Sequence, residues 1–316
     1  MTRPARKNER GAALLSILMI VAVMSVAALG AVESLGRSVA LARLSDERMQ
    51  IIWAARSAEA VAGISVQQIG DLGAQAFGKP AAFPLGRAMI LATLSDASNC
   101  FNLNSLGADA GGPAAHAAYR RLLEHSGILP GDALRLADTA ADWIDGDQEA
   151  RAYGAEADTY RRRPVAYRTP DRLMENVSEI RAVEGYTAKI LRRISGNICV
   201  RPDTNLAPLN INALQPSHAP LLAARLSEVM TLEEAEGAIR ARPVSGWGSL
   251  EAFLSLDAIS RIAPESRDDA ALSLRSGYVQ VDADIRVGSS REKIALTYRT
   301  DAPGSAVLVE RRVGAF

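Results

Sequence analysis

The run from Ala12 to Val32 constrains this chain more than any other stretch, because it holds twenty-one consecutive residues without a charge. A helix needs about 20 apolar residues to cross the hydrocarbon core of a bilayer. Glu33 follows the run, and the basic residues before it are Arg3, Arg6, Lys7 and Arg10. Because basic residues collect on the cytoplasmic side of a membrane span, the sequence predicts one span with a cytoplasmic N-terminus and the bulk outside.

The helix is expected to continue well beyond the membrane. No proline occurs between Glu33 and Gln68, and apolar residues recur there at helical spacing. We therefore expect one continuous helix from Ala12 to about Gln68. Its outer half is expected to pack on a sheet.

Alternation of apolar and polar residues predicts five strands, at 85–94, 99–103, 276–287, 291–299 and 306–312. Prolines and glycines, among them Pro80 and Pro84, mark a break before the first of them. In the third strand the predicted buried face consists of Val279, Val281, Ala283, Ile285 and Val287. Together the five strands are expected to form one antiparallel sheet.

The long segment between the second and third strands is predicted to be a helical insertion. Amphipathic helices are expected at 114–128, 134–144, 217–230, 231–242 and 248–256, with Thr231 and Glu234 as a capping box. A short sequence repeat, the echo, divides the segment. Its first copy is Asn102-Leu103-Asn104, and its second copy, Asn210-Ile211-Asn212, follows 108 residues later. Each copy precedes a helix, which predicts that the two halves are built alike.

Two cysteines, Cys100 and Cys199, are the only ones in the chain. They lie outside any zinc or redox motif. In an oxidising compartment outside the cytoplasm, such a pair most simply forms one disulfide, although two buried free thiols remain an alternative.

Composition argues against several function classes. The formal net charge is zero, so the sequence carries no global electrostatic footprint for nucleic acid. We also find no nucleophile-elbow, zinc-protease or phosphate-loop motif, so we expect neither an enzyme nor a small-molecule substrate.

One segment could bind a metal ion. Residues 142–158 contain six carboxylates and one arginine, and the acids are Asp142, Asp145, Asp147, Glu149, Glu156 and Asp158. Like charges at this density repel each other, so tight folding of the loop needs a counter-ion. Calcium prefers six to eight hard oxygen ligands. A calcium site, a solvated acidic loop and a pair of catalytic acids are the three interpretations that the residues leave open.

The N-terminus resembles the leader of the type IV pilin and pseudopilin superfamily. The glycine lies before the apolar run, so cleavage would leave the helix on the mature protein, with Gly11 as the last leader residue and Ala12 as the first mature one. Most members carry a glutamate at mature position five, where this chain has Ser16. That departure resembles the tip subunit, which has no neighbour above it. A plain signal anchor is the alternative.

The whole chain is similar to the general secretion pathway protein K family, the minor pseudopilin K of type II secretion. The similarity rests on Gly11, Ser16 and, in order, the segments 101–104, 142–145, 154–156 and 209–212. It implies an α+β fold with a long N-terminal pilin-like helix packed on an antiparallel sheet, and a large inserted all-α domain. It also implies bound calcium, which we assign to the six acids of residues 142–158.

The resemblance further implies a subunit of the bacterial inner membrane, with its bulk in the periplasm. The implied partners are the minor pseudopilins I and J and a prepilin peptidase that cleaves and methylates the N-terminus. The expected division is a leader (1–11), a transmembrane half-helix (12–32), a pseudopilin domain (33–105 and 275–316) and the inserted domain (106–274).

The second copy of the echo suggests one alternative function. Residues 209–213 also resemble the start of a helix-hairpin-helix DNA-binding module, which would make the chain a membrane-anchored periplasmic DNA binder. Acidic residues stand at Glu228, Glu233, Glu234 and Glu236, where such a module needs lysines. We therefore expect no nucleic-acid partner.

Overall fold

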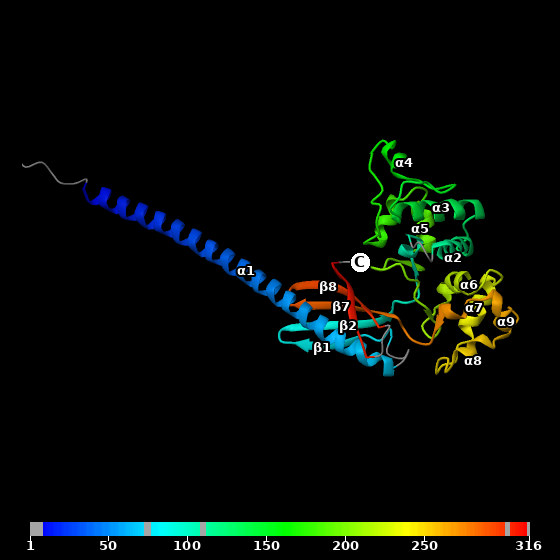
Figure 1. The fold of residues 1–316 in the computed structure, drawn as a ribbon. Coiled ribbons are helices and arrows are strands. Elements are labelled where there is room, and N and C mark those ends of the chain that lie inside the picture. The colour runs from blue at the N-terminus through cyan, green and yellow to red at the C-terminus, as the bar shows by residue number, and fades with distance from the viewer. Residues whose placement is uncertain (1–8, 73–76, 108–111, 301–303, 315–316) are drawn as a thin grey trace, which may run out of the picture.

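The computed structural model describes residues 9–72, 77–107, 112–300 and 304–314. Helix α1 (Glu9–Leu72) is 64 residues long and points away from the rest of the molecule (Figure 1). At 1.5 Å per residue its length is about 96 Å. Residues Ala12–Gln68 contain a stretch long and apolar enough to cross a membrane, and that stretch is fully exposed. Gly11 and Ala12 lie inside this helix, whereas leader residues 1–8 lie outside the described part of the chain.

The outer half of α1 packs on the sheet through small side chains. Its buried residues are Ile51, Ala54, Ala55, Ala58, Ala62 and Val66. Alanines let the helix backbone approach the strands closely, so side chains of the sheet fill most of the contact. The hydroxyl of Tyr298 donates a hydrogen bond to the carbonyl of Glu59 (2.7 Å) and fixes the helix along the sheet.

The sheet is antiparallel and has the strand order β1-β2-β7-β8-β9. Its strands are β1 (Ala81–Leu85), β2 (Ala88–Asp96), β7 (Tyr278–Val287), β8 (Ser290–Arg299) and β9 (Val307–Val313). The predicted buried face of β7 is confirmed, because Val279, Val281, Ala283, Ile285 and Val287 are all less than 5% exposed. These side chains form a core with α1.

Two strand predictions near residue 90 are wrong. Residues 85–94 do not form one strand, because a turn with Gly86 at φ +59° separates β1 from β2. Pro84 lies inside β1, which is an edge strand, and an edge tolerates a proline that lacks an N–H. Residues 99–103 do not join the sheet; only Phe101–Asn102 (β3) is extended, and it pairs in parallel with β4 (Ile198–Cys199).

The helical region lies at the end of the sheet away from the start of α1, and its helices separate into two groups (Figure 1). The first group comprises α2 (Gly112–His125), α3 (Pro130–Ile144), α4 (Ala157–Arg161) and α5 (Ala188–Ile194). The second comprises α6 (Ala219–Leu226), α7 (Leu232–Arg240), α8 (Leu250–Leu254) and α9 (Asp257–Ser260). The predicted capping box of Thr231 and Glu234 is present at α7. The long N-terminal helix, the antiparallel sheet and this helical region together confirm the expected fold class.

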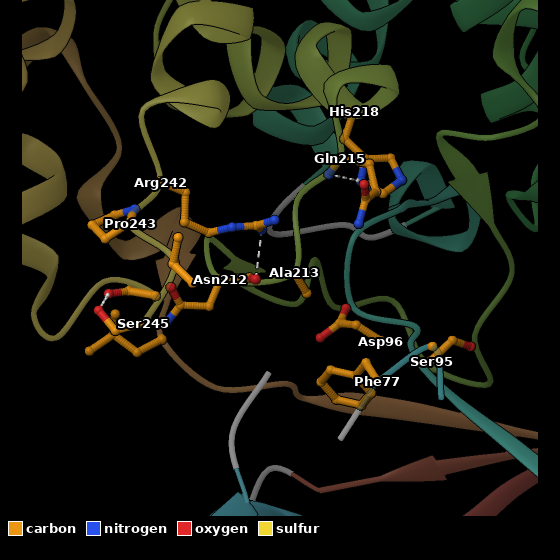
Figure 2. A pocket seen from close by; sticks show the side chains of 14 residues that line it. Phe77, Ser95, Asp96, Asn212, Ala213, Gln215, His218, Arg242, Pro243 and Ser245 are labelled. Carbon is orange, nitrogen blue, oxygen red and sulfur yellow. Dashed lines mark hydrogen bonds between the residues drawn. The ribbon is translucent and has the colours of Figure 1, made fainter. Parts of the chain in front are cut away.

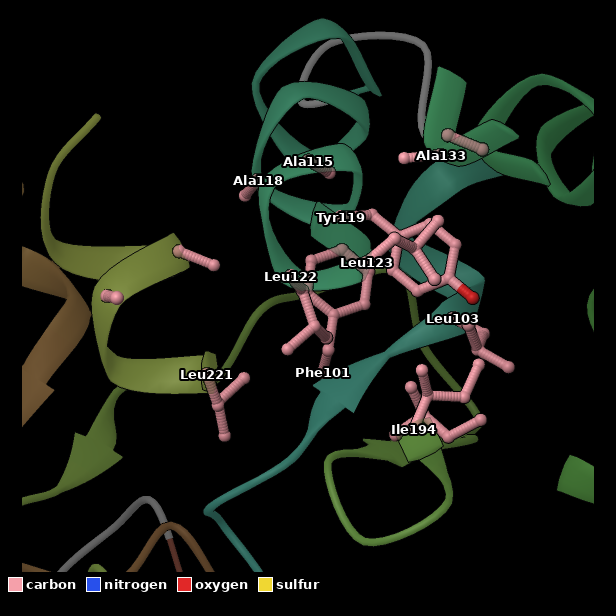
Figure 3. Packing of buried hydrophobic residues seen from close by; sticks show 14 of the residues in the cluster. Phe101, Leu103, Ala115, Ala118, Tyr119, Leu122, Leu123, Ala133, Ile194 and Leu221 are labelled. Carbon is pink, nitrogen blue, oxygen red and sulfur yellow. The ribbon is translucent and has the colours of Figure 1, made fainter. Parts of the chain in front are cut away.

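A continuous hydrophobic core joins the two helix groups. Phe101 stacks on Tyr119 with ring centroids 5.0 Å apart, and α2 contributes Leu122 and Leu123 beside them (Figure 3). Leu221 of α6 belongs to the same cluster. All five side chains are completely buried. The chain from Phe101 to Leu272 thus has a core of its own, separate from the core that α1 forms with the sheet.

The two copies of the echo make matching contacts. The amide of Asn104 accepts a hydrogen bond from the N–H of Met174 (2.8 Å) and donates one to the Met174 carbonyl (2.9 Å). Asn212 does the same with Trp247, at 2.6 and 3.1 Å. Each amide thus pairs with the backbone of one distant residue as a β-strand neighbour would. The repeated asparagine in each half fastens a long loop to the core.

The junction between the sheet and the helical region is tightly bonded. The amide of Asn99 pairs with the backbone of Asn210, accepting at 2.9 Å and donating at 3.1 Å. The guanidinium of Arg201 lies 4.5 Å from the ring centroid of Tyr278 at the start of β7. Cys100 and Cys199 form a disulfide here, with their Cα atoms 5.7 Å apart.

Candidate metal centre

The acidic loop connects the end of α3 to α4. Asp142 and Asp145 lie one turn apart at the C-terminal end of α3, and Asp145 is the C-cap residue. The chain then leaves the helix and returns, so that Glu156 becomes the N-cap of α4. This return brings Glu156 next to Asp142 and Asp145.

Three carboxylates meet at one point. One oxygen each from Asp145, Asp147 and Glu156 lies within 4.8 Å of the other two. Glu156 is only 6% exposed, and neither of its carboxylate oxygens has a hydrogen-bond partner among the described residues. The Oδ1 atom of Asp145 is buried in the same unbonded state within that part of the chain. Buried polar atoms are nearly always paired, and these three oxygens are available to coordinate a cation.

A single arginine partly balances the acids. Arg151 lies 3.1 Å from Asp145 and 3.3 Å from Asp142, and its backbone N–H donates to Asp142 at 3.2 Å. Arg151 makes no ion pair or hydrogen bond with Glu156 in the part of the chain that the structure describes. Within the described residues, Glu156 therefore has no paired cation.

The protonation equilibria reflect this crowding. Burial, followed by the neighbouring charges of Asp142 and Asp145, raises the pKa of Glu156 to about 7. Burial is also the main cause that raises the pKa of Asp142 to about 6. The pKa of Asp145 is raised by burial and by the charge of Asp147. A bound cation would stabilise the charged form of every one of these groups.

Gly154 is required for the close approach of the loop to α3. A Cβ atom at this position would lie 1.8 Å from Oδ2 of Asp142, a distance that no side chain can occupy. The backbone N–H of Gly154 also bonds to the carbonyl of Arg151 (3.0 Å), which closes a turn. The glycine therefore lets the turn that carries Arg151 lie against the buried carboxylate.

The six predicted acids do not all point to one centre. Asp145, Asp147 and Glu156 come together, and Asp142 lies beside them. Glu149 is exposed, and only its backbone N–H contacts the cluster, at Oδ1 of Asp147 (2.8 Å). Asp158 has a 71% exposed side chain and pairs with Arg161 at 2.7 Å. The placement of Asp158 and Glu149 does not favour them as ligands of this centre.

One residue of the site was missed from sequence. The charge of Asp171 contributes to the raised pKa of both Asp145 and Glu156. It lies outside the acidic segment, after Pro170, and adopts a positive φ of 51°. Only the loop's path brings it back to the cluster, so no spacing in the sequence could have indicated it.

The residues at this centre fit a hard divalent cation. Carboxylate oxygens are the ligands that calcium prefers, and carbonyls and water complete its shell of six to eight. In the described part of the chain, both carboxylate oxygens of Glu156 and Oδ1 of Asp145 lack a hydrogen-bond partner, so they are available to a cation. The site can therefore bind a metal ion.

An apolar N-terminal helix packed on an antiparallel sheet, with a helical region bearing an acidic site, defines a pilin-like subunit with a membrane anchor. Models of the family described as "Type II secretion system (T2SS), protein K" match residues 99–203 and 209–275. The chain belongs to this family of secretion pseudopilins.

Several relatives share most of the chain. The type II secretion system protein K of Pectobacterium carotovorum subsp. carotovorum is 33% identical over 301 residues, which cover 90% of each chain. That of Klebsiella pneumoniae is 33% identical over 266 residues, covering 80% of this chain and 81% of the relative.

A solved structure shares the fold. The crystal structure of the GspK-GspI-GspJ complex from enterotoxigenic Escherichia coli has a chain that matches with a TM-score of 0.72. Its sequence is 24% identical, and the match covers 87% of this chain and 99% of that one. In this chain Glu228 lies between α6 and α7 and pairs with Arg121 at 2.8 Å. Glu228 is one of the acids that stand where a DNA-binding hairpin needs lysines.

Proposed function

We propose that this chain caps the tip of the type II secretion pseudopilus, in a complex with the minor pseudopilins I and J. In this role it helps to nucleate the filament that exports folded proteins across the outer membrane. Support comes from its family and from the fold shared with a chain solved in complex with GspI and GspJ. The role is mechanical, and we expect no catalytic activity.

The observation that carries the tip assignment is Ser16. A carboxylate inside the bilayer costs about 2.5–3.5 kcal/mol on insertion scales, so a glutamate there needs a partner. The hydroxyl of Ser16 instead donates to the carbonyl of Ala12 in its own helix (2.9 Å). The anchor therefore needs no amine from a neighbouring subunit above it.

The position of the helical region supports the same role. It lies beyond the end of the sheet away from the start of α1 (Figure 1). A further subunit stacked on that end would meet the helices rather than a free sheet and helix. We propose that this bulk, which we assign to an inserted domain at 106–274, ends growth of the filament.

Partner subunits are proposed to contact the exposed side of α1. Trp53, Ile52 and Ile64 are 64%, 47% and 59% exposed, although they lie in the half of the helix whose other side packs on the sheet. Tryptophan is enriched among the residues that dominate interfaces. This apolar face suits contact with the helices of I and J, because without a partner the face is exposed to water.

Processing and location follow from the anchor. We propose that prepilin peptidase cleaves between Gly11 and Ala12 and that Ala12 is then methylated, with 12–32 in the inner membrane and the remainder in the periplasm. The Cys100–Cys199 disulfide supports a location outside the reducing cytoplasm. The sheet and α1 would form the pseudopilin domain.

Calcium is the ion we propose for the acidic centre. Asp145, Asp147 and Glu156 would hold it, with Asp142 supplying charge behind them. When bound, the ion offsets the mutual repulsion of these acids and fixes the loop between α3 and α4.

The first test is the intact mass of the chain extracted from membranes, after expression with and without a prepilin peptidase. Loss of residues 1–11 and a gain of one methyl group, only with the peptidase, is the expected result. An uncut chain in both preparations would leave a plain signal anchor and remove the basis for the tip assignment.

The second test is co-purification with I and J. Trp53→Glu places a charge on the proposed contact face and should weaken recovery of the complex about tenfold or more. Val165→Glu is the matched control, because Val165 is also exposed (79%) but lies on a loop of the helical region. Equal loss of the complex in both variants, or in neither, would argue against this face as the contact.

A further inference from the structure

The disulfide between Cys100 and Cys199 has different surroundings at its two sulfur atoms. Nη2 of Arg201 lies 3.6 Å from Sγ of Cys100 and also donates a hydrogen bond to the carbonyl of Ala97. In the part of the chain that the structure describes, no side chain donates a hydrogen bond to Sγ of Cys199. Both cysteines are partly exposed, so the bond is within reach of a small molecule in solvent.

Arg201 is a buried cation that has no carboxylate partner among the described residues. It is only 7% exposed, and burial lowers the pKa of its guanidinium more than the charges of Glu310 and Asp203 raise it. Asp203 instead accepts from the hydroxyl of Tyr278 (3.1 Å), and Glu310 pairs with Arg312 (3.3 Å). The guanidinium lies 4.5 Å from the ring centroid of Tyr278, and this cation–π contact offsets only part of the desolvation.

The backbone of Arg201 is held by the first copy of the echo. Its N–H donates to the amide oxygen of Asn102 (3.0 Å), and its carbonyl accepts from the amide of Asn104 (2.7 Å). Asn102 is also the register partner of Cys199 in the pair of β3 and β4. Because these hydrogen bonds do not depend on the disulfide, we expect Arg201 to stay beside Cys100 when the disulfide opens.

Asp96 is the nearest acid to Cys100 along the chain, and it does not pair with Arg201 within the described ranges. Its carboxylate accepts from the backbone N–H of Ser98 (2.8 Å) and from the amide of Asn210 (3.0 Å). Figure 2 shows its side chain at the cavity between the end of β2 and the loop after α7, and neither cysteine nor Arg201 lines that cavity. The negative charge of Asp96 is therefore bonded elsewhere.

The two sulfur atoms differ as leaving groups for this reason. In thiol–disulfide exchange the attacking thiolate bonds to one sulfur, and the other sulfur leaves as a thiolate. A neighbouring arginine stabilises a thiolate, and a more stable thiolate leaves faster. The position of Arg201 thus favours Cys100 as the leaving group and Cys199 as the sulfur that is attacked.

We propose that Cys199 is a site of reversible modification by small-molecule thiols, with Arg201 as the residue that directs them there. The thiolate of the small molecule forms a bond to Sγ of Cys199, the Cys199–Cys100 bond breaks, and its electron pair stays on Sγ of Cys100. The number of disulfide bonds is unchanged, so the step needs no oxidant or reductant. The new thiolate supplies the anion that Arg201 lacks, and its attack on the mixed disulfide restores the original bond.

The test treats the full chain in detergent with reduced glutathione, traps free thiols with N-ethylmaleimide and maps both cysteines by peptide mass spectrometry. We expect glutathione on Cys199 with N-ethylmaleimide on Cys100 in about fivefold or greater excess over the reverse product. In urea the two products should be nearly equal, because unfolding separates Arg201 from Cys100. Equal products in the folded chain, an excess of glutathione on Cys100, or no adduct at all would overturn the proposal.

Variants show whether Arg201 directs the reaction. Arg201→Gln removes the charge and should reduce the excess to the level seen in urea, whereas Arg201→Lys should retain part of it. Arg225→Gln is the matched control, because Arg225 is equally buried (6% exposed) and donates to the backbone carbonyl of Ala207 (3.3 Å). An excess that persists in Arg201→Gln, or that falls equally in Arg225→Gln, would rule out Arg201 as the directing residue.

A measurement on the native sequence covers the case in which Arg201→Gln does not fold. The folded chain is reduced with dithiothreitol, which is then removed, and alkylation of each cysteine by iodoacetamide is followed against pH by peptide mass spectrometry. Cys100 should reach its half-maximal rate at a lower pH than Cys199, because Arg201 stabilises its thiolate. The same midpoint for both cysteines would refute the proposed role of Arg201.

Discussion

Glu156 has an environment that strongly disfavours the charged form of its carboxyl group. It is buried, it has no hydrogen-bond partner in the described part of the chain, and several like charges surround it. The sequence placed it in an acidic segment, and the structure brings Asp145, Asp147 and Glu156 of that segment together. It could not separate them from Glu149 and Asp158, because exposure and pairing depend on the path of the loop. Asp171 was missed for the same reason.

The raised pKa values predict an unusual pH dependence for the metal-free protein. Asp142 and Glu156 titrate in the folded state at about 6 and 7, above the ordinary values of about 3.9 and 4.3. Between these limits the folded state binds more protons than the unfolded state, so the free energy of unfolding falls as pH rises. In EDTA we expect a lower melting temperature at pH 7.5 than at pH 5.

Calcium should reverse that trend, because it stabilises the charged carboxylates. The melting temperature at pH 7.5 should rise on addition of calcium, and Glu156→Gln should remove most of this rise. Glu149→Gln, an exposed acid of the same loop, serves as the control and should respond like the native chain. A melting temperature that calcium leaves unchanged would contradict a stabilising ion at this centre.

At the scale of elements, prediction from the sequence was most accurate where apolar residues keep one regular spacing over many positions. The long α1 helix and the buried face of β7 both follow from regular spacing. Strand β1 was missed because Pro84 was interpreted as a break, although an edge strand can hold a proline. The parallel pair of β3 and β4 joins residues almost 100 positions apart, and nothing local indicates such a partner.

The echo leads to a prediction about loops. Asn104 is completely buried and binds the backbone of Met174 and of Arg201. Asn104→Ala leaves these groups unpaired, so we expect a loss of about 1–3 kcal/mol in the free energy of unfolding for each group that water cannot reach. Asn205→Ala, an exposed position, should change it little. Urea unfolding measures both, and equal midpoints would show that the echo does not fasten the loop.

At the scale of the whole molecule, the chain has two cores that meet at a bonded junction. The disulfide at this junction joins residues 99 positions apart. Such a link stabilises mainly by restricting the unfolded chain. The sequence indicated the pair only through the expected compartment, since the two cysteines belong to no motif.

Removing the disulfide should therefore weaken the protein as a whole. For the Cys100→Ser and Cys199→Ser double variant we expect the free energy of unfolding to fall by about 2–4 kcal/mol. The urea midpoint, measured with calcium present, checks this. Reduction of the native chain should have a similar effect, and two thiols that react in denatured, unreduced protein would contradict the bond.

The attachment of the helical region has an evolutionary consequence. The chain leaves the sheet after Asp96 and returns next to it, where Val279 is the register partner of Asp96. The two ends are thus as close as the ends of an ordinary hairpin loop, and a tight turn between them would preserve α1 and every strand of the sheet. A single genetic event could add or remove the entire region without disturbing its host. A small ancestral subunit could have acquired its large appendage in this way, already able to fold before the appendage arrived.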